Sequence, residues 1–251
     1  MVDAAEISQN ESVLEIGPGT GILTFLLTER AKQVTAIEID PTLVSYLKRE
    51  VKKRGIENLH VIRGDALKNE LPDFQKVVSS LPYNIASPLT FRLLPLNFKT
   101  GILMYQAEFA LRLIAAPGSK ERSALTLRAH YYAEIEGLFP VSRENFYPSP
   151  EVDSVVVRVK PRTFPYSLRN RDFYMKLIGV MFMHRRRKLK NSLLLGYMNL
   201  PGTQGIKKQD FRAILHDSVE ERLLEKRAEE LEVEEVVDIA NNLYSRLKRM
   251  D

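Results

Sequence analysis

The stretch "LEIGPGTGIL", Leu14 to Leu23, decides the fold of this chain. An apolar, strand-like run ends at Gly17, alternate glycines follow at Gly19 and Gly21, and a helix-like run begins at once. Glycines at such a junction let a ligand approach the backbone, and the start of the helix offers free amide groups. The stretch therefore predicts a strand, turn and helix that hold a nucleoside-type ligand or, alternatively, a tight turn that binds nothing.

Strand-like and helix-like runs alternate on both sides of this stretch. Strands are expected over residues 12–17, 33–39, 58–65, 75–80 and 101–106, and helices over residues 21–31 and 41–55. This alternation is typical of βαβ units in a parallel, doubly wound sheet. The fold class we predict is therefore α/β, with a Rossmann-like first domain.

The pattern changes after residue 106. Residues 130–141 and 152–161 predict two longer strands that could pair antiparallel, with a proline-punctuated loop between them. Two prolines mark a linker over 161–167, and only helical runs follow, at 170–184, 187–199, 207–216 and 233–248. We predict a cofactor-binding catalytic domain over residues 1–164 and a small all-α C-terminal domain over residues 165–251.

Acidic residues near the glycine loop narrow the choice of ligand. Glu38 ends the second strand, where an acid can accept both hydrogen bonds of a ribose diol. The loop and Glu38 alone suit NAD, FAD or S-adenosylmethionine, although the spacing Gly-x-Gly-x-Gly differs from the dinucleotide pattern. Glu15 would repel a pyrophosphate but tolerate a methionine ammonium, which favours S-adenosylmethionine. Asp65 in "GDAL" could accept an adenine amino group; taken alone, it is more typical of a helix cap.

The second informative stretch is "VVSSLPYNIASP", Val77 to Pro88. Pro82 cannot donate to a sheet ladder, so the strand must end there. The carbonyl of Leu81 and the side chain of Ser80 could then accept the two hydrogens of an exocyclic adenine amine, and the ring of Tyr83 could stack on the base. Such acceptors would aim the nitrogen lone pair, so that in-line positioning supplies much of the rate without a prior general base.

Six motifs occur in one order: "EIGPGTG", "IEID", "GDAL", "SLPYNIASP", "FYPSPEVDS" and "HRRRKLKNSL". Together, over roughly residues 2–250, they resemble the KsgA family of ribosomal RNA adenine dimethyltransferases. The resemblance implies S-adenosylmethionine-dependent dimethylation of two adjacent adenosines near the 3′ end of small-subunit ribosomal RNA, with a role in small-subunit biogenesis. By the resemblance, Gly17, Glu38 and Asp65 fall on cofactor positions, Ser80 to Tyr83 fall on the catalytic motif, and Phe146 matches an aromatic residue of the family. In total we predict a cofactor site of Glu15, Gly17, Gly19, Glu38, Asp65, Ala66 and Ser80, and a catalytic group of Ser80, Leu81, Pro82, Tyr83 and Phe146.

Phe146 in this resemblance packs on the flipped base from the side opposite Tyr83, which agrees with the need to take a base out of its stack. The alternative is that Phe146 packs in the core beneath its loop. The basic block "HRRRKLK", residues 184–190, then supplies phosphate contacts from Arg185, Arg186, Arg187, Lys188 and Lys190. A solvated helix flank is the alternative for that block.

Charge is distributed unevenly. The net charge is +5, yet residues 217–238 hold ten acidic and three basic residues, so the rest of the chain is strongly positive. Such a distribution suits a polyanionic partner. The partner expected from the resemblance is small-subunit ribosomal RNA or an immature small ribosomal subunit.

Two features depart from the family pattern. Ser80 stands where the family usually has asparagine, and a hydroxyl is a poorer fixed acceptor than an amide carbonyl. The chain also starts just before the first strand, without the usual N-terminal Gln-x-Phe-Leu segment. These departures motivate one alternative, a catalytically weak or inactive RNA-binding assembly factor. Another alternative is a related enzyme that methylates large-subunit RNA.

Several classes of protein are disfavoured by composition. The chain has no cysteine and four scattered histidines, which argues against disulfides and a metal site. No apolar run approaches the roughly 18 residues that span a bilayer, and the acidic start does not resemble a signal peptide. We expect a cytoplasmic monomer without a metal.

Overall fold

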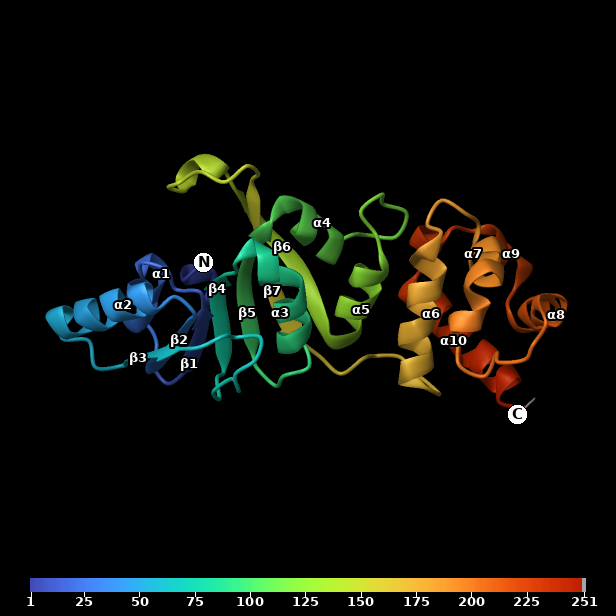
Figure 1. Cartoon of the computed structure of the whole chain (residues 1–251), viewed down its shortest axis with the longest axis horizontal. Coiled ribbons are helices and arrows are strands. Elements are labelled where there is room, and N and C mark those ends of the chain that lie inside the picture. The colour runs from blue at the N-terminus through green and yellow to red at the C-terminus, as the bar shows by residue number, and fades with distance from the viewer. Residues whose placement is uncertain (250–251) are drawn as a thin grey trace. The chain divides into compact units, whose positions relative to one another are not determined.

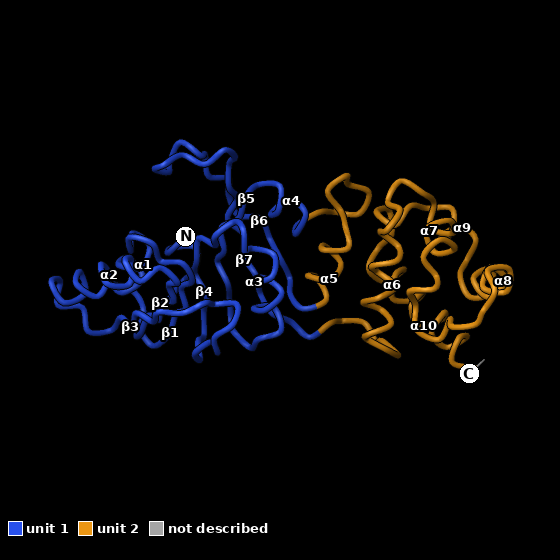
Figure 2. Tube along the Cα trace, viewed as in Figure 1, with its two compact units in different colours: residues 1–114, 132–163 blue, residues 115–131, 164–251 orange. Residues whose placement is uncertain are grey.

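The computed structural model describes residues 1–249, which form two compact units (Figure 1). Unit 1 comprises residues 1–114 and 132–163, and unit 2 comprises residues 115–131 with the described residues from Phe164 onward (Figure 2). Residues 115–131 were predicted to belong to the first domain. They fold with unit 2 because Arg122 Nη2 donates to the Leu231 carbonyl at 2.8 Å and Gly118 N donates to the Glu229 carbonyl at 2.7 Å.

A seven-stranded sheet with the order β3-β2-β1-β4-β5-β7-β6 forms the centre of unit 1. The first five strands run parallel, and β7 pairs antiparallel with both β5 and β6. The doubly wound parallel sheet and the antiparallel pair are thus confirmed. The strands are β1 (Ser12–Ile16), β2 (Gln33–Glu38), β3 (Leu59–Arg63), β4 (Lys76–Ser80), β5 (Thr100–Gln106), β6 (Ala133–Val141) and β7 (Ser154–Pro161).

The helices of unit 1 include two that the sequence predicted, α1 (Ile22–Thr28) and α2 (Pro41–Arg54). In α2, the Asp40 side chain accepts from Thr42 N at 2.7 Å and Gly55 closes the helix in a left-handed conformation. Helices α3 (Ala86–Leu93) and α4 (Ala107–Leu113) were not predicted. The 3₁₀ turns are η1 (Asp3–Ala5), η2 (Tyr83–Ile85) and η3 (Arg143–Asn145).

The central strands are buried along almost their whole length, as expected where helices cover both faces of a parallel sheet. Val13, Val34, Val78, Ile102 and Val156 form much of the core on one face, and none of them is more than 1% exposed. Each such side chain contributes roughly 1.5–3 kcal/mol on burial. This rigid core fixes where the strands end.

Strands β1 and β4 separate at their carboxyl ends. Their ladder pairs only Val13 with Lys76 and Leu14 with Val77. Beyond it, the Ser79 hydroxyl takes over, donating to the Ile16 carbonyl at 2.5 Å and accepting from Ile16 N at 3.3 Å. This is the position where the strand order reverses, and ligands of doubly wound sheets bind at such a crevice.

Unit 2 is helical, with a core that includes Phe173, Leu177, Leu193, Phe211 and Leu243. Residues 130–132, which the sequence analysis placed in a strand, complete helix α5, so the strand begins at Ala133. The helices are α5 (Ala124–Tyr132), α6 (Arg171–Met183), α7 (Leu189–Gly196), α8 (Lys208–Ser218), α9 (Glu221–Glu225) and α10 (Val233–Leu247), with 3₁₀ turns η4 (Tyr197–Asn199) and η5 (Ala228–Glu230).

Candidate active site

The three loop glycines all have left-handed backbones, with φ of 70°, 58° and 87° at Gly17, Gly19 and Gly21. A Cβ on Gly21 would lie 2.7 Å from Leu47 Cδ2, so glycine is required there for packing. A Cβ on Gly17 would lie 3.1 Å from Pro82 Cγ, whereas nothing lies within 4 Å of one on Gly19. The loop therefore contacts the "LPY" segment at Gly17 and leaves open space at Gly19.

Glu15 is a buried carboxyl group with an unused acceptor. Its side chain is on β1, the residue is 2% exposed, and Oε2 has no hydrogen-bond partner among the described residues. Burial raises the pKa of Glu15 to about 8, and the nearby charge of Glu38 acts in the same direction. A buried acceptor without a donor is costly, and a cationic ligand group at this place would remove the cost.

Glu38, at the end of β2, is held by three backbone amides. Its Oε1 accepts from Ile39 N at 2.9 Å and Asp40 N at 3.0 Å, and its Oε2 accepts from Gly19 N at 3.2 Å. The carboxylate is thus fixed beside the glycine loop. Because a carboxylate has about four acceptor positions, both hydroxyls of a diol could bind only if one of these three amides released its oxygen.

Asp65 and Ala66 follow the end of β3, and local hydrogen bonds hold both residues in place. Asp65 Oδ1 accepts from Leu67 N at 2.9 Å, the turn-capping arrangement that the residue alone suggests. Arg92 on α3 donates from Nη1 to the Ala66 carbonyl at 2.6 Å. Arg92 was not among the predicted residues, because its only signal is one basic residue in a mostly apolar run.

The "LPY" segment leaves one backbone acceptor unused. Leu81 N donates to the Met104 carbonyl at 3.2 Å, while no residue that the structure describes donates to the Leu81 carbonyl. Pro82 then starts the η2 turn, and Tyr83 Oη lies 2.8 Å from Oγ of the fully buried Ser154. Ser154 thereby orients the Tyr83 ring, a role that the sequence did not reveal.

Phe146 lies in the loop between β6 and β7, which Figure 1 shows as an extension beyond the ends of both strands. Its ring is partly buried and packs against the core cluster that contains Ala5, Val13 and Val156. Within the described part of the chain, Tyr83 and Phe146 make no ring contact with each other. This environment matches the packing alternative for Phe146, and the base-stacking role stays a prediction.

The structure brings the other predicted residues together at adjacent strand ends. Gly19 N bonds to Glu38 as described above, and Gly64 N donates to the Glu38 carbonyl at 2.9 Å. The short distance from Gly17 to Pro82 joins the β1 loop to the segment after β4. The ends of β1, β2, β3 and β4 therefore form one continuous site.

The basic block of unit 2 is largely neutralised by the acidic segment. Arg185 Nε lies 2.8 Å from a Glu229 carboxylate oxygen, and Lys188 and Lys190 both pair with Glu225. The two lysines lower the pKa of Glu225 to about 2. Arg186 and Arg187 are exposed, and neither forms an ion pair within the described chain. The uneven charge seen in the sequence is thus partly balanced inside unit 2.

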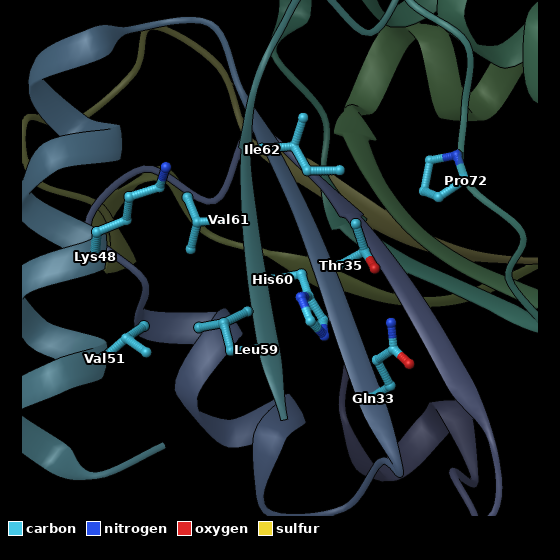
Figure 3. Close-up of a pocket in the computed structure, with 9 residues that line it drawn as sticks. All are labelled: Gln33, Thr35, Lys48, Val51, Leu59, His60, Val61, Ile62 and Pro72. Carbon is cyan, nitrogen blue, oxygen red and sulfur yellow. The ribbon is translucent and has the colours of Figure 1, made fainter. Parts of the chain in front are cut away.

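A separate hollow of about 460 Å³ lies at β3, the edge strand of the sheet (Figure 3). Figure 3 shows Lys48 and Val51 of α2 on one side of β3, and His60 with Thr35 on the other. None of the predicted cofactor or catalytic residues lines this hollow, so it is not part of the candidate site.

No helix within residues 1–249 is long and apolar enough to cross a membrane. No group of three or more histidine, cysteine, aspartate or glutamate side chains there is placed to hold a metal ion.

The doubly wound sheet, the glycine loop with acids at two strand ends, and the free carbonyl beside Tyr83 define a Rossmann-like methyltransferase. The sequence model for ribosomal RNA adenine dimethylases matches residues 1–228. The "Probable ribosomal RNA small subunit methyltransferase A" of Methanosarcina acetivorans is 44% identical over 97% of this chain and 87% of its own length. The chain belongs to the ribosomal RNA adenine dimethylase family.

Other relatives and solved structures agree with this assignment. The protein of the same name from Methanothermobacter thermautotrophicus is 38% identical over 97% of this chain and 84% of its own length. A dimethyladenosine transferase from Plasmodium falciparum superposes with a TM-score of 0.79 at 30% identity, over 95% of this chain and 91% of its own. The 23S rRNA methyltransferase ErmE gives a TM-score of 0.71 at 28% identity, over 97% and 95%.

Proposed function

We propose that this protein uses S-adenosylmethionine to dimethylate the exocyclic amines of two adjacent adenosines near the 3′ end of small-subunit ribosomal RNA. The observation that carries the proposal is the contact between the glycine loop and the "LPY" segment, where a Cβ on Gly17 would lie 3.1 Å from Pro82. A methyl donor in the loop and an amine at the segment would be immediate neighbours. Holding two reactants so closely can supply much of the rate.

The donor side of the site is suited to a cationic amino acid group next to a nucleoside. Glu15 offers its unpaired buried oxygen to the methionine ammonium, and Glu38 offers its carboxylate to the ribose hydroxyls. Gly19 leaves room for the ligand, and Asp65 with Ala66 flanks the adenine. When bound, S-adenosylmethionine supplies an electrophilic methyl group on a sulfonium.

The acceptor side is suited to an adenine amine. The Leu81 carbonyl is free to accept one of its two hydrogens, and the Ser80 hydroxyl can accept the other. Tyr83, oriented by Ser154, can stack on the base, and stacking contributes about 1–3 kcal/mol per base. For Phe146 to stack on the other face, its ring would have to leave the packing that it makes without RNA.

Small-subunit RNA is the substrate that the relatives favour. The relatives that are 38–44% identical to this chain are named for the small subunit. We therefore expect the full chain to label undermethylated small subunits from radioactive S-adenosylmethionine and to leave large subunits unlabelled. Labelling of the large subunit alone would overturn this choice of substrate.

Ser80 offers a test of the catalytic assignment. Ser80→Asn should supply a fixed carbonyl acceptor and raise the methylation rate roughly ten- to hundredfold, since one good acceptor contributes about 1–3 kcal/mol. Ser79→Asn is a control one position earlier, and it should lower activity because it breaks the Ile16 contacts. No gain from Ser80→Asn in protein that binds the donor normally would count against a role for Ser80 at the amine.

A further inference from the structure

Unit 2 has a hollow of about 490 Å³ where the end of α10, the end of α8 and the segment before α6 come together. Arg169, Arg246 and Arg249 line it, together with Ser218 and Ser245. A second hollow of about 540 Å³ shares Arg169, Ser245 and Arg249 with the first. We call these two adjoining spaces the arginine hollow.

Positive charge in the arginine hollow is poorly compensated. The acidic residue on its wall is Asp217, whose Oδ2 lies 3.4 Å from Arg246 Nη2 in an exposed pair. Arg169 and Arg249 have no carboxylate partner within residues 1–249. Guanidinium groups that converge on a concave surface repel one another, and an anion bound between them would relieve that repulsion.

The position of Arg169 is fixed before any ligand binds. Both ends of the Asn241 side chain hold its segment: Oδ1 accepts from Arg169 N at 2.8 Å, and Nδ2 donates to the Ser167 carbonyl at 2.9 Å. Arg169 Nη1 also donates to Ser245 Oγ, which itself donates to the Asn241 carbonyl at 2.6 Å. A group ordered in advance loses less entropy on binding.

A structural role explains only part of this arrangement. Basic side chains in the last turn of a helix are stabilised by the helix dipole, which accounts for Arg246 on α10. It does not account for a hollow, or for an arginine brought to it from the segment before α6. Guanidinium groups match the oxygens of a phosphate with paired hydrogen bonds, which lysine cannot do.

We propose that the arginine hollow binds backbone phosphates of the RNA substrate. The proposal rests on the proposed function and extends the contact surface of unit 2 beyond the basic block, in which acids already engage Arg185, Lys188 and Lys190. Contacts to phosphates orient an RNA without reading its sequence. The arginine hollow therefore positions the RNA, and sequence discrimination lies elsewhere.

The test measures how salt affects the binding of undermethylated small-subunit RNA to the full chain. Each lost phosphate contact reduces the slope of log K against log salt by about 0.7–0.9. We expect Arg169→Gln with Arg246→Gln to reduce that slope by about 1–2. The control is Lys207→Gln with Lys208→Gln, which removes the same charge at the other end of α8, roughly 15 Å from Asp217 along the helix. The control slope should match the wild type.

A variant with the opposite expected effect guards against misfolding. Asp217→Asn frees Arg246 from its carboxylate partner and should raise RNA affinity severalfold at low salt. Equal slopes for the arginine and lysine variants, or no gain from Asp217→Asn, would overturn the proposal. Should the double arginine variant fail to fold, Arg246→Gln alone decides, since its side chain is exposed.

Methyl transfer is measured in parallel to separate the two proposals. Wild-type and lysine-variant proteins that bind RNA with the expected slopes but transfer no methyl group would contradict the proposed function and leave the arginine hollow supported. Normal transfer with no difference in slope would contradict the arginine hollow alone.

Discussion

Two buried glutamates lie at opposite ends of β1 and differ in what surrounds them. Glu11, at the start, is 5% exposed and pairs with Lys76 Nζ at 3.0 Å and Lys99 Nζ at 2.8 Å. Glu15, at the end, is 2% exposed and has an oxygen without a partner. Burial raises the pKa of Glu15 to about 8, whereas hydrogen bonds from Lys99, Ser8 N and Lys76 outweigh burial and lower the pKa of Glu11 to about 2.

The difference separates a structural charge from a functional one. Lys76 Nζ also donates to the Ala5 carbonyl at 2.8 Å and the Glu6 carbonyl at 2.6 Å, so the Glu11 network ties the N-terminal turn η1 to the sheet. Glu15, by contrast, has a buried oxygen that no described residue satisfies, and it lies two residues before the first glycine of the loop. A buried carboxyl group left unsatisfied at a strand end therefore indicates a ligand.

The largest effect should come from Glu11→Gln, which leaves Lys76 buried without its counter-charge. We expect the free energy of unfolding to fall by about 3–5 kcal/mol, measured by urea denaturation. The control is Glu136→Gln, whose side chain is 61% exposed and pairs with Arg158, and it should cost no more than about 1 kcal/mol. Equal losses of stability in the two variants would contradict the structural role assigned to Glu11.

Lowering the pH should weaken the network of Glu11 and its lysine partners in the wild-type protein. The folded pKa of Glu11, about 2, lies below its ordinary value of 4.5, so its contribution is present above pH 4.5 and is lost as the pH falls toward 2. The loss between pH 5 and pH 3 is roughly 2 kcal/mol. Urea titrations between pH 5 and 3 should show it in the wild type and not in Glu11→Gln.

Glu15 has the opposite pH dependence, which sharpens the comparison. Its folded pKa, about 8, lies above 4.5, so its stabilising contribution is complete below pH 4.5 and is lost as the pH rises through 8. The free energy of unfolding of the wild type should therefore fall relative to that of the Glu15→Gln variant as the pH rises from 5 to 8. A wild type that gains stability relative to Glu15→Gln over that range would contradict this sign.

The Glu15→Gln variant should keep its fold and bind the cofactor more weakly. Loss of a charge-assisted hydrogen bond to the methionine ammonium is expected to raise the Kd for S-adenosylmethionine about ten- to hundredfold in calorimetric titration. The matched ligand is 5′-methylthioadenosine, which lacks the ammonium and should bind both proteins equally. A loss of both ligands would show that Glu15 shapes the site instead of contacting the ammonium.

The smallest effect is on the pH dependence of cofactor binding. Because Glu15 is mostly protonated at pH 6, binding of a cation must expel that proton, and affinity should rise roughly twentyfold between pH 6 and 7.5. Calorimetry in buffers of different ionisation enthalpy should detect the released proton. Glu15→Gln should bind with a flat pH profile and release none.

Local patterns were enough to predict most of the sheet and the glycine loop. Strand alternation, the Asp40-Pro41 start of α2 and the Gly55 stop each depend on neighbours in the chain. The end of β4 followed from Pro82, which cannot donate a hydrogen bond. For Glu15, the charge and the position before the loop were sufficient to favour a cationic ligand.

Contacts between distant residues could not be predicted in this way. Arg122 reaches a carbonyl 109 positions along the chain, which moves residues 115–131 into unit 2. Ser154 orients Tyr83 from 71 positions away, and Glu225 engages Lys190 from 35. In each case the neighbouring residues in the sequence do not indicate the partner, because the two residues meet only in the folded chain.

The close approach of Gly17 to Pro82 has an evolutionary consequence. A side chain at position 17 would press on the Pro82 ring, 3.1 Å from its Cβ, so a substitution there requires the acceptor turn to shift slightly. Substitutions at the two sites are therefore expected to show epistasis, and drift in one motif restricts the mutations that the other can accept.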